Sequence, residues 1–244
     1  MRETSGKFRK IGILGGMGVE ATLELMKRVH ATTAAEDDQD YIPMFVDMNP
    51  QVPSRIAHLI EKTGPDPGPV LADMAIRLEQ AGAEVLAMPC NTAHLYASEI
   101  EASVGIALLN MPKLACSEVA QGMTRGAIVG ILASPATDIT GLFGNFLSEF
   151  GIATAYPENE ADILASIRRI KKSGPSDADI ALLEREAKAL AQLGAEKVII
   201  GCSEFSLISK DIQSPVLVLD TLDVLVRAIV TFSGARAKAD IRIP

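Results

Sequence analysis

The chain has 244 residues, of which 48% are hydrophobic and 22% are charged, a composition typical of a globular protein with a full core. The net charge of −8 argues against a nucleic-acid-binding protein, because phosphates require a clustered basic face, but a few local cations still allow a small anionic substrate. No apolar run is long enough to span a membrane, and three widely separated cysteines do not form a disulfide framework. We therefore expect a cytoplasmic protein with free thiols.

Short apolar runs alternate with amphipathic stretches along the whole chain. Strands are predicted at 10–15, 42–47, 84–89, 105–109, 126–132, 196–200 and 215–219. Helices are predicted at 18–33, 67–81, 91–102, 112–122, 138–150, 160–172, 177–193 and 220–232. Because strands and helices alternate, and several strands are apolar enough to be buried on both faces, the pattern predicts an α/β fold with parallel sheets.

Two stretches of the chain repeat one another. The triplet Gly-Ala-Glu at 82–84 recurs at 194–196, and the same offset carries Cys90 onto Cys202. The two cysteines therefore occupy equivalent positions of a duplicated unit. Two halves that each place a thiol at the end of a strand can face those thiols across one cleft.

A second repeated triplet, Gly-Ile-Leu, begins each half at 12–14 and 130–132. We therefore expect two pseudo-symmetric α/β domains with mostly parallel sheets and an active site in the cleft between them. The first domain is expected to comprise 1–111 plus 215–244, because the strand and helix after 215 lie outside the repeat. The second domain is expected to comprise 112–214.

Each cysteine of the repeat follows an apolar run and precedes a predicted helix. Ligands of doubly wound folds bind at this junction, where free backbone N–H groups and the helix dipole can hold a carboxylate and lower the pKa of a thiol. Cys90 and Cys202 are therefore the candidate reactive residues. Cys116 lies on an amphipathic helix and is predicted to be a core residue.

Other chemistry-bearing residues give weaker signals. The cysteines and histidines lack the close pairing that zinc sites require, so no metal site is predicted. His94, four residues after Cys90, is expected to be structural. The Gly15-Gly16-Met17-Gly18 segment lacks a dinucleotide fingerprint and a P-loop lysine, and predicts a tight turn whose N–H groups approach a small ligand.

Four motifs in order cover nearly the whole chain. They are Ile-Gly-Ile-Leu-Gly-Gly-Met-Gly at 11–18, Asn-Pro-Gln-Val-Pro-Ser-Arg at 49–55, Met-Pro-Cys-Asn-Thr-Ala-His at 88–94 and Gly-Cys-Ser-Glu at 201–204. Together they resemble the cofactor-independent, two-cysteine aspartate/glutamate racemase family, and within it the aspartate racemase branch. The fourth motif departs from the family's usual Gly-Cys-Thr-Glu by a serine that keeps the hydroxyl.

The resemblance implies a mechanism without pyridoxal phosphate, other cofactors or metal, in a homodimeric enzyme. One cysteine thiolate removes the α-proton of the substrate, and the other cysteine delivers a proton to the opposite face. Arg55 and Lys172 would hold the side-chain carboxylate of the substrate, although the adjacent Lys171 could take the place of Lys172. The substrate-binding residues implied in this way are Met17, Gln51, Arg55, Asn91, Thr92, Lys172, Ser203 and Glu204.

We therefore expect an isomerase that interconverts L- and D-aspartate, with glutamate as the next candidate, by proton transfer between Cys90 and Cys202. Its partner is a small acidic amino acid, and domain closure is expected because the charge that develops in the reaction needs a closed, dry cleft. Hydantoin racemisation and maleate isomerisation are alternatives on the same scaffold, although a hydantoin has no second carboxylate to meet Arg55. A non-enzymatic dicarboxylate-binding protein is the alternative from another class.

Overall fold

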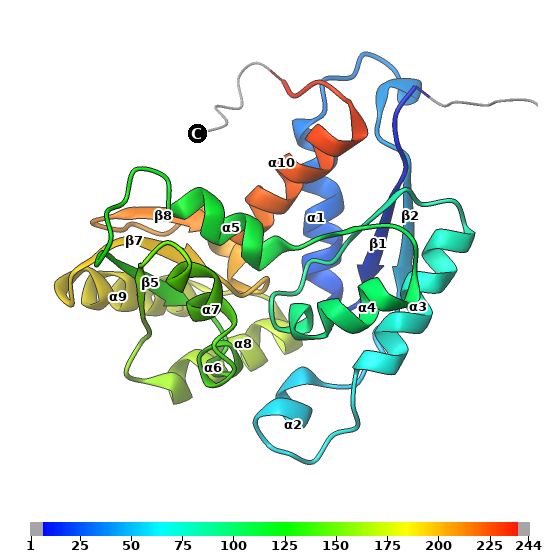
Figure 1. Ribbon diagram of the computed structural model, residues 1–244. Helices are drawn as coiled ribbons and strands as arrows, with labels where there is room; N and C mark the ends of the chain where they lie inside the picture. Colours follow the sequence, from blue (N-terminus) through cyan, green and yellow to red (C-terminus); the bar gives the residue numbers. More distant parts are fainter. Residues whose placement is uncertain (1–6, 239–244) are drawn as a thin grey trace, which may run out of the picture.

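The computed structural model describes residues 7–238, which form two α/β halves placed side by side (Figure 1). Each half contains a sheet of four parallel strands, in the orders β2-β1-β3-β4 and β6-β5-β7-β8. The strands are β1 (Ile11–Gly15), β2 (Met44–Met48), β3 (Val85–Ala87), β4 (Leu108–Leu109), β5 (Ile128–Leu132), β6 (Ala153–Ala155), β7 (Ala195–Ile200) and β8 (Leu217–Asp220). This architecture confirms the predicted fold class.

Helices connect the strands and cover both sheets. The α-helices are α1 (Val19–Thr32), α2 (Arg55–Leu59), α3 (Gly68–Gln80), α4 (Ala97–Ser103), α5 (Met111–Val119), α6 (Pro135–Ile139), α7 (Leu142–Ser148), α8 (Glu160–Ser173), α9 (Asp177–Gln192) and α10 (Thr221–Ser233). Three short 3-10 helices are η1 (Asp38–Asp40), η2 (Thr92–Tyr96) and η3 (Phe205–Ile208). The helix predicted at 91–102 thus begins as η2 and continues as α4.

The inner strands β1 and β5 are buried on both faces of their sheets, as their apolar sequences predict. In β1, Ile13 packs with α1 and α10, whereas the next residue, Leu14, packs with α3 and α4 on the opposite face. In β5, Ile131 and Leu132 divide in the same way between the α5–α7 face and the α8–α9 face. Removing one such leucine costs about 2–5 kcal/mol of folding free energy.

The strand after residue 215 corrects the predicted domain division. This strand, β8, pairs in parallel with β7 of the second sheet, with Ile200 opposite Asp220, and so does not complete the first domain. Helix α10 returns toward the first half, where it packs against α1 (Figure 1), and the segment after it pairs with the end of α1 through a bridge between Ala237 and Thr33. Helix α10 also contacts α5 and reaches the second core through Val224. The chain therefore crosses back at the start of α10.

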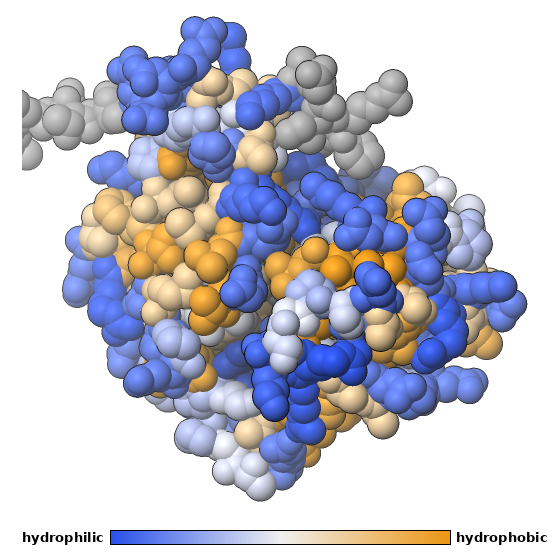
Figure 2. All heavy atoms as spheres, turned by 180° about the vertical axis from the view of Figure 1, so that it is seen from behind, coloured by the Kyte–Doolittle hydropathy of each residue, from blue (hydrophilic) through white to orange (hydrophobic). Residues whose placement is uncertain are grey.

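The surface seen from behind is mixed in character. Figure 2 shows apolar patches that are interrupted by hydrophilic side chains. Exposed large hydrophobic residues are scattered over several elements, with Leu23 on α1 and Leu217 at the start of β8 among them. Within residues 7–238, no helix combines the length and the apolar character needed to cross a membrane.

Candidate active site

The carboxyl ends of the two sheets meet at a small cavity of about 40 Å³, lined by residues of both halves. The first half contributes Arg55 and Cys90, and the second half contributes Lys171, Cys202 and Glu204. The two cysteines of the sequence repeat therefore line one space, as predicted. They are 8% and 7% exposed.

The Cys90 segment follows β3 and is held by backbone hydrogen bonds. The Cys90 N–H donates to the Met88 carbonyl (2.9 Å), and the Cys90 carbonyl lies 2.8 Å from Nδ1 of His94. Nε2 of His94 accepts from the Met111 N–H (3.2 Å), so Nδ1 carries the proton and donates to Cys90. Burial lowers the pKa of His94 to about 4. The ring is thus neutral, and both of its nitrogens are occupied by backbone groups, which fits the structural role expected from the sequence.

The Cys202 segment directly follows β7. The backbone at Gly201 packs closely against Phe143, since an added Cβ would lie 2.6 Å from the Phe143 ring. Sγ of Cys202 donates to Oε2 of Glu204 at 3.0 Å. Oε1 of the same carboxylate lies 3.3 Å from Nζ of Lys171. A thiol, a carboxylate and an ammonium group therefore form a short chain at one end of the cavity.

The surroundings of Cys202, with the neighbouring Glu204 and Lys171, determine the protonation state of its thiol. Burial raises the pKa of the Cys202 thiol well above its usual value, and the charge and hydrogen bond of Glu204 raise it further. Lys171 and the Glu204 backbone N–H oppose this shift without reversing it. The expectation that a helix start lowers this pKa is therefore wrong for Cys202. The helix that follows is only the four-residue η3, and a carboxylate lies in direct contact with the sulfur.

Arg55 is a buried cation with spare hydrogen-bonding capacity. It begins α2, is 9% exposed, and donates from Nη1 to the carbonyls of Pro53 (2.7 Å) and Val52 (3.3 Å). Its Nε is buried without a hydrogen-bond partner, and no carboxylate within residues 7–238 forms an ion pair with it. A buried guanidinium at a cavity wall requires an anionic partner.

Two predicted substrate-binding residues lie outside the cavity. Lys172 is exposed on another side of α8, because consecutive helical residues point about 100° apart, and Lys171 lines the cavity instead, one turn after Ile167. Gln51 is exposed in the turn after β2, where its backbone N–H donates to the Asn49 side chain (3.0 Å). The other predicted residues, Met17, Asn91, Thr92, Ser203 and Glu204, all line the cavity.

Two of these polar side chains are engaged by other parts of the protein. Nδ2 of Asn91 donates to the Thr221 hydroxyl (2.9 Å), which leaves its buried Oδ1 without a partner. The Ser203 hydroxyl donates to the Pro89 carbonyl (2.7 Å) and so joins the two cysteine segments directly. The Ser203 hydroxyl has thus used its single donor, whereas Asn91 has used one of its two N–H donors.

Ser134, which lines the cavity at the end of β5, was not predicted from the sequence. Neither was Ile167 on α8. Ser134 lies at the position that corresponds to Gly16 when the Gly-Ile-Leu repeat is extended, and this signal could have identified it. In the first half, the tight turn is required at Gly16, whose φ is +90° and whose added Cβ would overlap the Asn49 backbone at 2.3 Å.

A second, larger cavity of about 340 Å³ adjoins the first. The two share Met17, Ser54, Arg55, Lys171 and Glu204. The cavity between the cysteines has room for only a few water molecules at roughly 10–15 Å³ each. An amino acid therefore needs this adjoining space or a separation of the two halves to enter.

Comparison with known proteins shows which family the sequence matches. The family model "Asp/Glu/Hydantoin racemase" matches residues 14–229. Broad specificity amino-acid racemase RacX of Bacillus subtilis is 24% identical over 226 residues, which cover 91% of this chain and 96% of RacX.

Two solved structures share the fold. Picrophilus torridus aspartate racemase superposes with a TM-score of 0.81 at 26% identity, covering 94% of this chain and 96% of that one. Glutamate racemase of Francisella tularensis superposes with a TM-score of 0.61 at 19% identity, covering 91% and 80%. The family match covers most of the chain, and both cysteines of the repeat meet in one cavity. The chain therefore belongs to the Asp/Glu/hydantoin racemase family and is an amino-acid racemase, an isomerase.

Proposed function

We propose that this racemase interconverts L- and D-aspartate by proton transfer between Cys90 and Cys202, without an organic cofactor or a metal ion. The observation that carries the substrate assignment is Arg55, a buried guanidinium at the cavity wall without a carboxylate partner in the described chain. A side-chain carboxylate of the substrate would supply the missing anion, and the planar donor geometry of arginine suits it.

The reaction requires one thiolate and one thiol. The thiolate takes the α-proton from one face of the substrate, and the electron pair left on the α-carbon delocalises into the α-carboxylate. The thiol on the other face then donates its proton to the α-carbon and becomes the thiolate. One proton has entered and one has left, so the product is the mirror image of the substrate and the two cysteines have exchanged roles.

Glu204 supports the proposed role of Cys202. The protonated thiol donates to this carboxylate at 3.0 Å, so Cys202 is ready to act as the acid. For the reverse direction Cys202 must become the base, and Glu204 lies within reach to take its proton. Lys171, at 3.3 Å from the same carboxylate, balances the charge in each state.

The α-carboxylate gains negative charge during the reaction, and fixed donors must stabilise it. Thr92 and the first backbone N–H groups of η2 supply such donors in the proposed complex, since the first turn of a helix leaves its N–H groups without helical partners. The unpartnered Oδ1 of Asn91 is an acceptor, and it suits the substrate ammonium group.

Aspartate is preferred over glutamate in this proposal because the closer relative by structure is an aspartate racemase, with a TM-score of 0.81 against 0.61 for the glutamate enzyme. The proposal also includes a homodimer, from the family resemblance, and a cytoplasmic location, since free thiols fit a reducing compartment. Sedimentation of the purified protein tests the dimer.

Solvent-deuterium exchange tests the proposal directly. L-Aspartate incubated with the protein in ²H₂O should give D-aspartate that carries deuterium at the α-carbon, while the L-aspartate that remains early in the reaction keeps its proton. Proton NMR and chiral chromatography measure the two quantities. Binding of aspartate without exchange would point to a dicarboxylate-binding protein. Turnover of a hydantoin or of maleate, but not of aspartate, would point to the other reactions of this scaffold.

A further inference from the structure

One hydroxyl group joins both cysteine segments. Thr221, the first residue of α10, is fully buried at 0% exposure. Its hydroxyl donates to the Ile200 carbonyl (3.0 Å) and accepts from Nδ2 of Asn91 (2.9 Å). Ile200 ends β7 two residues before Cys202, and Asn91 directly follows Cys90. A single side chain therefore touches the chain beside each cysteine.

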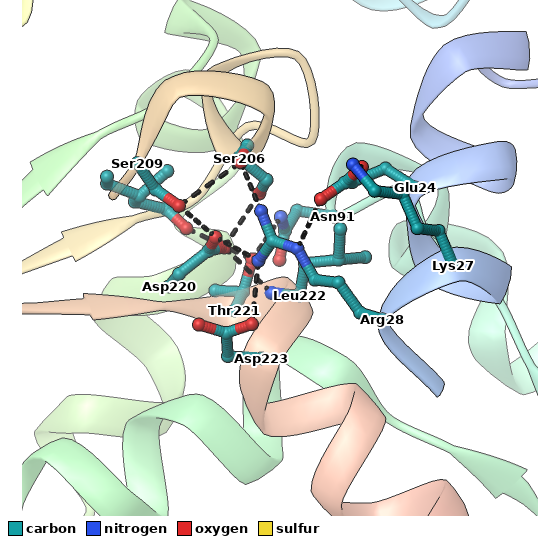
Figure 3. Close-up of polar contacts among 11 residues, drawn as sticks. Glu24, Lys27, Arg28, Asn91, Ser206, Ser209, Asp220, Thr221, Leu222 and Asp223 are labelled. Carbon is teal, nitrogen blue, oxygen red and sulfur yellow. Dashed lines mark hydrogen bonds and ion pairs between the residues drawn. The ribbon is translucent and has the colours of Figure 1, made fainter. Parts of the chain in front are cut away.

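The preceding residue, Asp220, holds the loop that follows β7 (Figure 3). Its Oδ1 accepts from the Ser206 hydroxyl (2.6 Å) and from the Leu222 N–H (2.9 Å). Its Oδ2 accepts from the Ser209 hydroxyl (2.6 Å) and from Nη1 of Arg28 (2.7 Å). The Asp220 carboxylate is 5% exposed, and these four donors occupy its roughly four acceptor sites.

These bonds reach Cys202 through the backbone. The N–H groups of Phe205 and Ser206 donate to the Cys202 carbonyl at 3.0 and 3.2 Å. Because Asp220 fixes Ser206, it also fixes the turn that presents Cys202 to the cavity.

Arg28 adds the first half of the protein to this network. It projects from α1, is 6% exposed, and donates from Nη1 to Asp220 and Asp223 at 2.7 Å each and from Nε to Glu24 at 2.8 Å. Its Nη2 donates to the Ser206 carbonyl. Burial alone would lower the pKa of Arg28, but the carboxylates, Asp220 foremost, raise it. Arg28 therefore stays charged and ties α1 to the Cys202 loop.

We propose that Arg28, Asp220 and Thr221 form a positioning site that sets the separation of Cys90 and Cys202. None of the three residues lines the active-site cavity, so they act through the cysteine segments and not on the substrate. The inference rests on the proposed two-cysteine function and extends it to residues outside the cavity.

The separation of the thiols decides the fate of the carbanion. With correct spacing, the second cysteine protonates the opposite face before the first cysteine returns a proton. With loosened spacing, the first cysteine exchanges the captured proton with solvent and then returns a deuteron to the same face. Deuterium would then enter the substrate enantiomer without inversion.

Thr221→Val removes the bridging hydroxyl and keeps the shape of the side chain. We expect kcat for aspartate racemisation to fall by about 10²-fold, the cost of a misplaced catalytic group, with little change in KM. In ²H₂O, the ratio of deuterium in recovered L-aspartate to D-aspartate formed should rise. Thr221→Ser should restore both quantities, and Thr231→Val, at an exposed position of the same helix, should behave like the parent.

An unchanged kcat and an unchanged exchange ratio in Thr221→Val would overturn the inference, as would equal losses in Thr221→Ser. A fall in rate with an unchanged ratio would also overturn it, because a general loss of folded enzyme lowers exchange and racemisation together. If Thr221→Val does not fold, Ser206→Ala deletes one bond to Asp220 and should raise the same ratio. An inactive parent would instead overturn the proposed function itself.

Discussion

Arg55 is the residue on which the proposed substrate choice depends. Replacing it by alanine should weaken catalysis on aspartate by about 2–5 kcal/mol, since the substrate carboxylate loses a desolvated partner. Alanine, which has no side-chain carboxylate, should be turned over poorly by both proteins and lose much less. Steady-state kcat/KM for the two amino acids measures the difference. Equal losses would show that Arg55 holds the α-carboxylate or the α2 turn instead.

Glu204 raises the pKa of Cys202, so removing its charge should lower that pKa. The rate should fall at high pH, because the reaction needs one protonated thiol. In Glu204→Gln the Cys202 thiol loses its proton at lower pH, so this alkaline limb of the kcat/KM profile should shift to lower pH. The rate should also fall by about 10²-fold, because Cys202 loses its base. The loss in kcat/KM must be equal for both enantiomers, since L- and D-aspartate have equal free energies and the equilibrium constant is one.

A pH profile of kcat/KM for D- and L-aspartate measures this shift. Glu20→Gln removes an exposed charge at the wall of the adjoining cavity and serves as the control. An alkaline limb that stays in place, or moves to higher pH, in Glu204→Gln would contradict the assignment of the raised pKa to this carboxylate.

His94 makes the free energy of unfolding depend on pH in the acidic range. Its pKa is lowered from 6.5 to about 4 in the folded protein, so the unfolded chain binds a proton as the pH falls below 6.5 and the native state does so only near pH 4. The free energy of unfolding should therefore decrease between these values, by about 3 kcal/mol from this residue. Urea unfolding at several pH values measures the slope, which should flatten in His94→Gln. A slope as steep in the variant would assign it to other groups.

At the scale of the element, the register of α8 decides which lysine serves the site. Lys171→Met should reduce kcat/KM for aspartate by about 10²-fold, since Glu204 and the substrate lose a nearby cation. Lys172→Met, one residue along the same helix, is the matched control and should stay within about twofold of the parent. The reverse order of effects would place Lys172 at the cavity in solution.

Element types followed from periodicity, but some boundaries did not. The segment predicted as one helix at 138–150 is broken at Gly141, whose φ of +66° ends α6 and begins α7. Strand β6 was missed because its three residues form no apolar run and lie at the sheet edge. Helix α2 was missed because it has only five residues, which are positioned by contacts with α6 of the other half. Short elements carry too little pattern to be predicted locally.

For the whole molecule, the proposed mechanism requires one thiol from each half. Cys90→Ala and Cys202→Ala should each reduce racemisation by at least about 10²-fold in both directions, because every turnover needs an acid and a base. Cys116→Ala, in the core between α5 and α7, should keep its activity and lose only stability. Chiral chromatography of aspartate turned over by each variant gives the rates. Full activity in either of the first two variants would refute the paired-cysteine mechanism.

The sequence by itself determined the fold class, the duplication and the placement of Cys90 and Cys202 at one cavity. These features are local or periodic: apolar runs predict buried parallel strands, and a repeated motif places equivalent residues at equivalent strand ends. Arg55, Asn91 and Ser203 entered only through resemblance to a family. In the folded protein, Nε of Arg55 is without a hydrogen-bond partner, whereas Asn91 donates to Thr221 and Ser203 donates to the Pro89 carbonyl.

Only the tertiary structure decided how the halves share the chain and how the cysteines are tuned. Strand β8 joins the second sheet because it pairs beside β7, a long-range choice that no local pattern encodes. The pKa of Cys202 rises because burial and Glu204 act on it together, and burial exists only after both halves pack. Arg28 lies far in sequence from the consecutive residues Asp220 and Thr221, and their network forms only where α1, η3 and α10 meet.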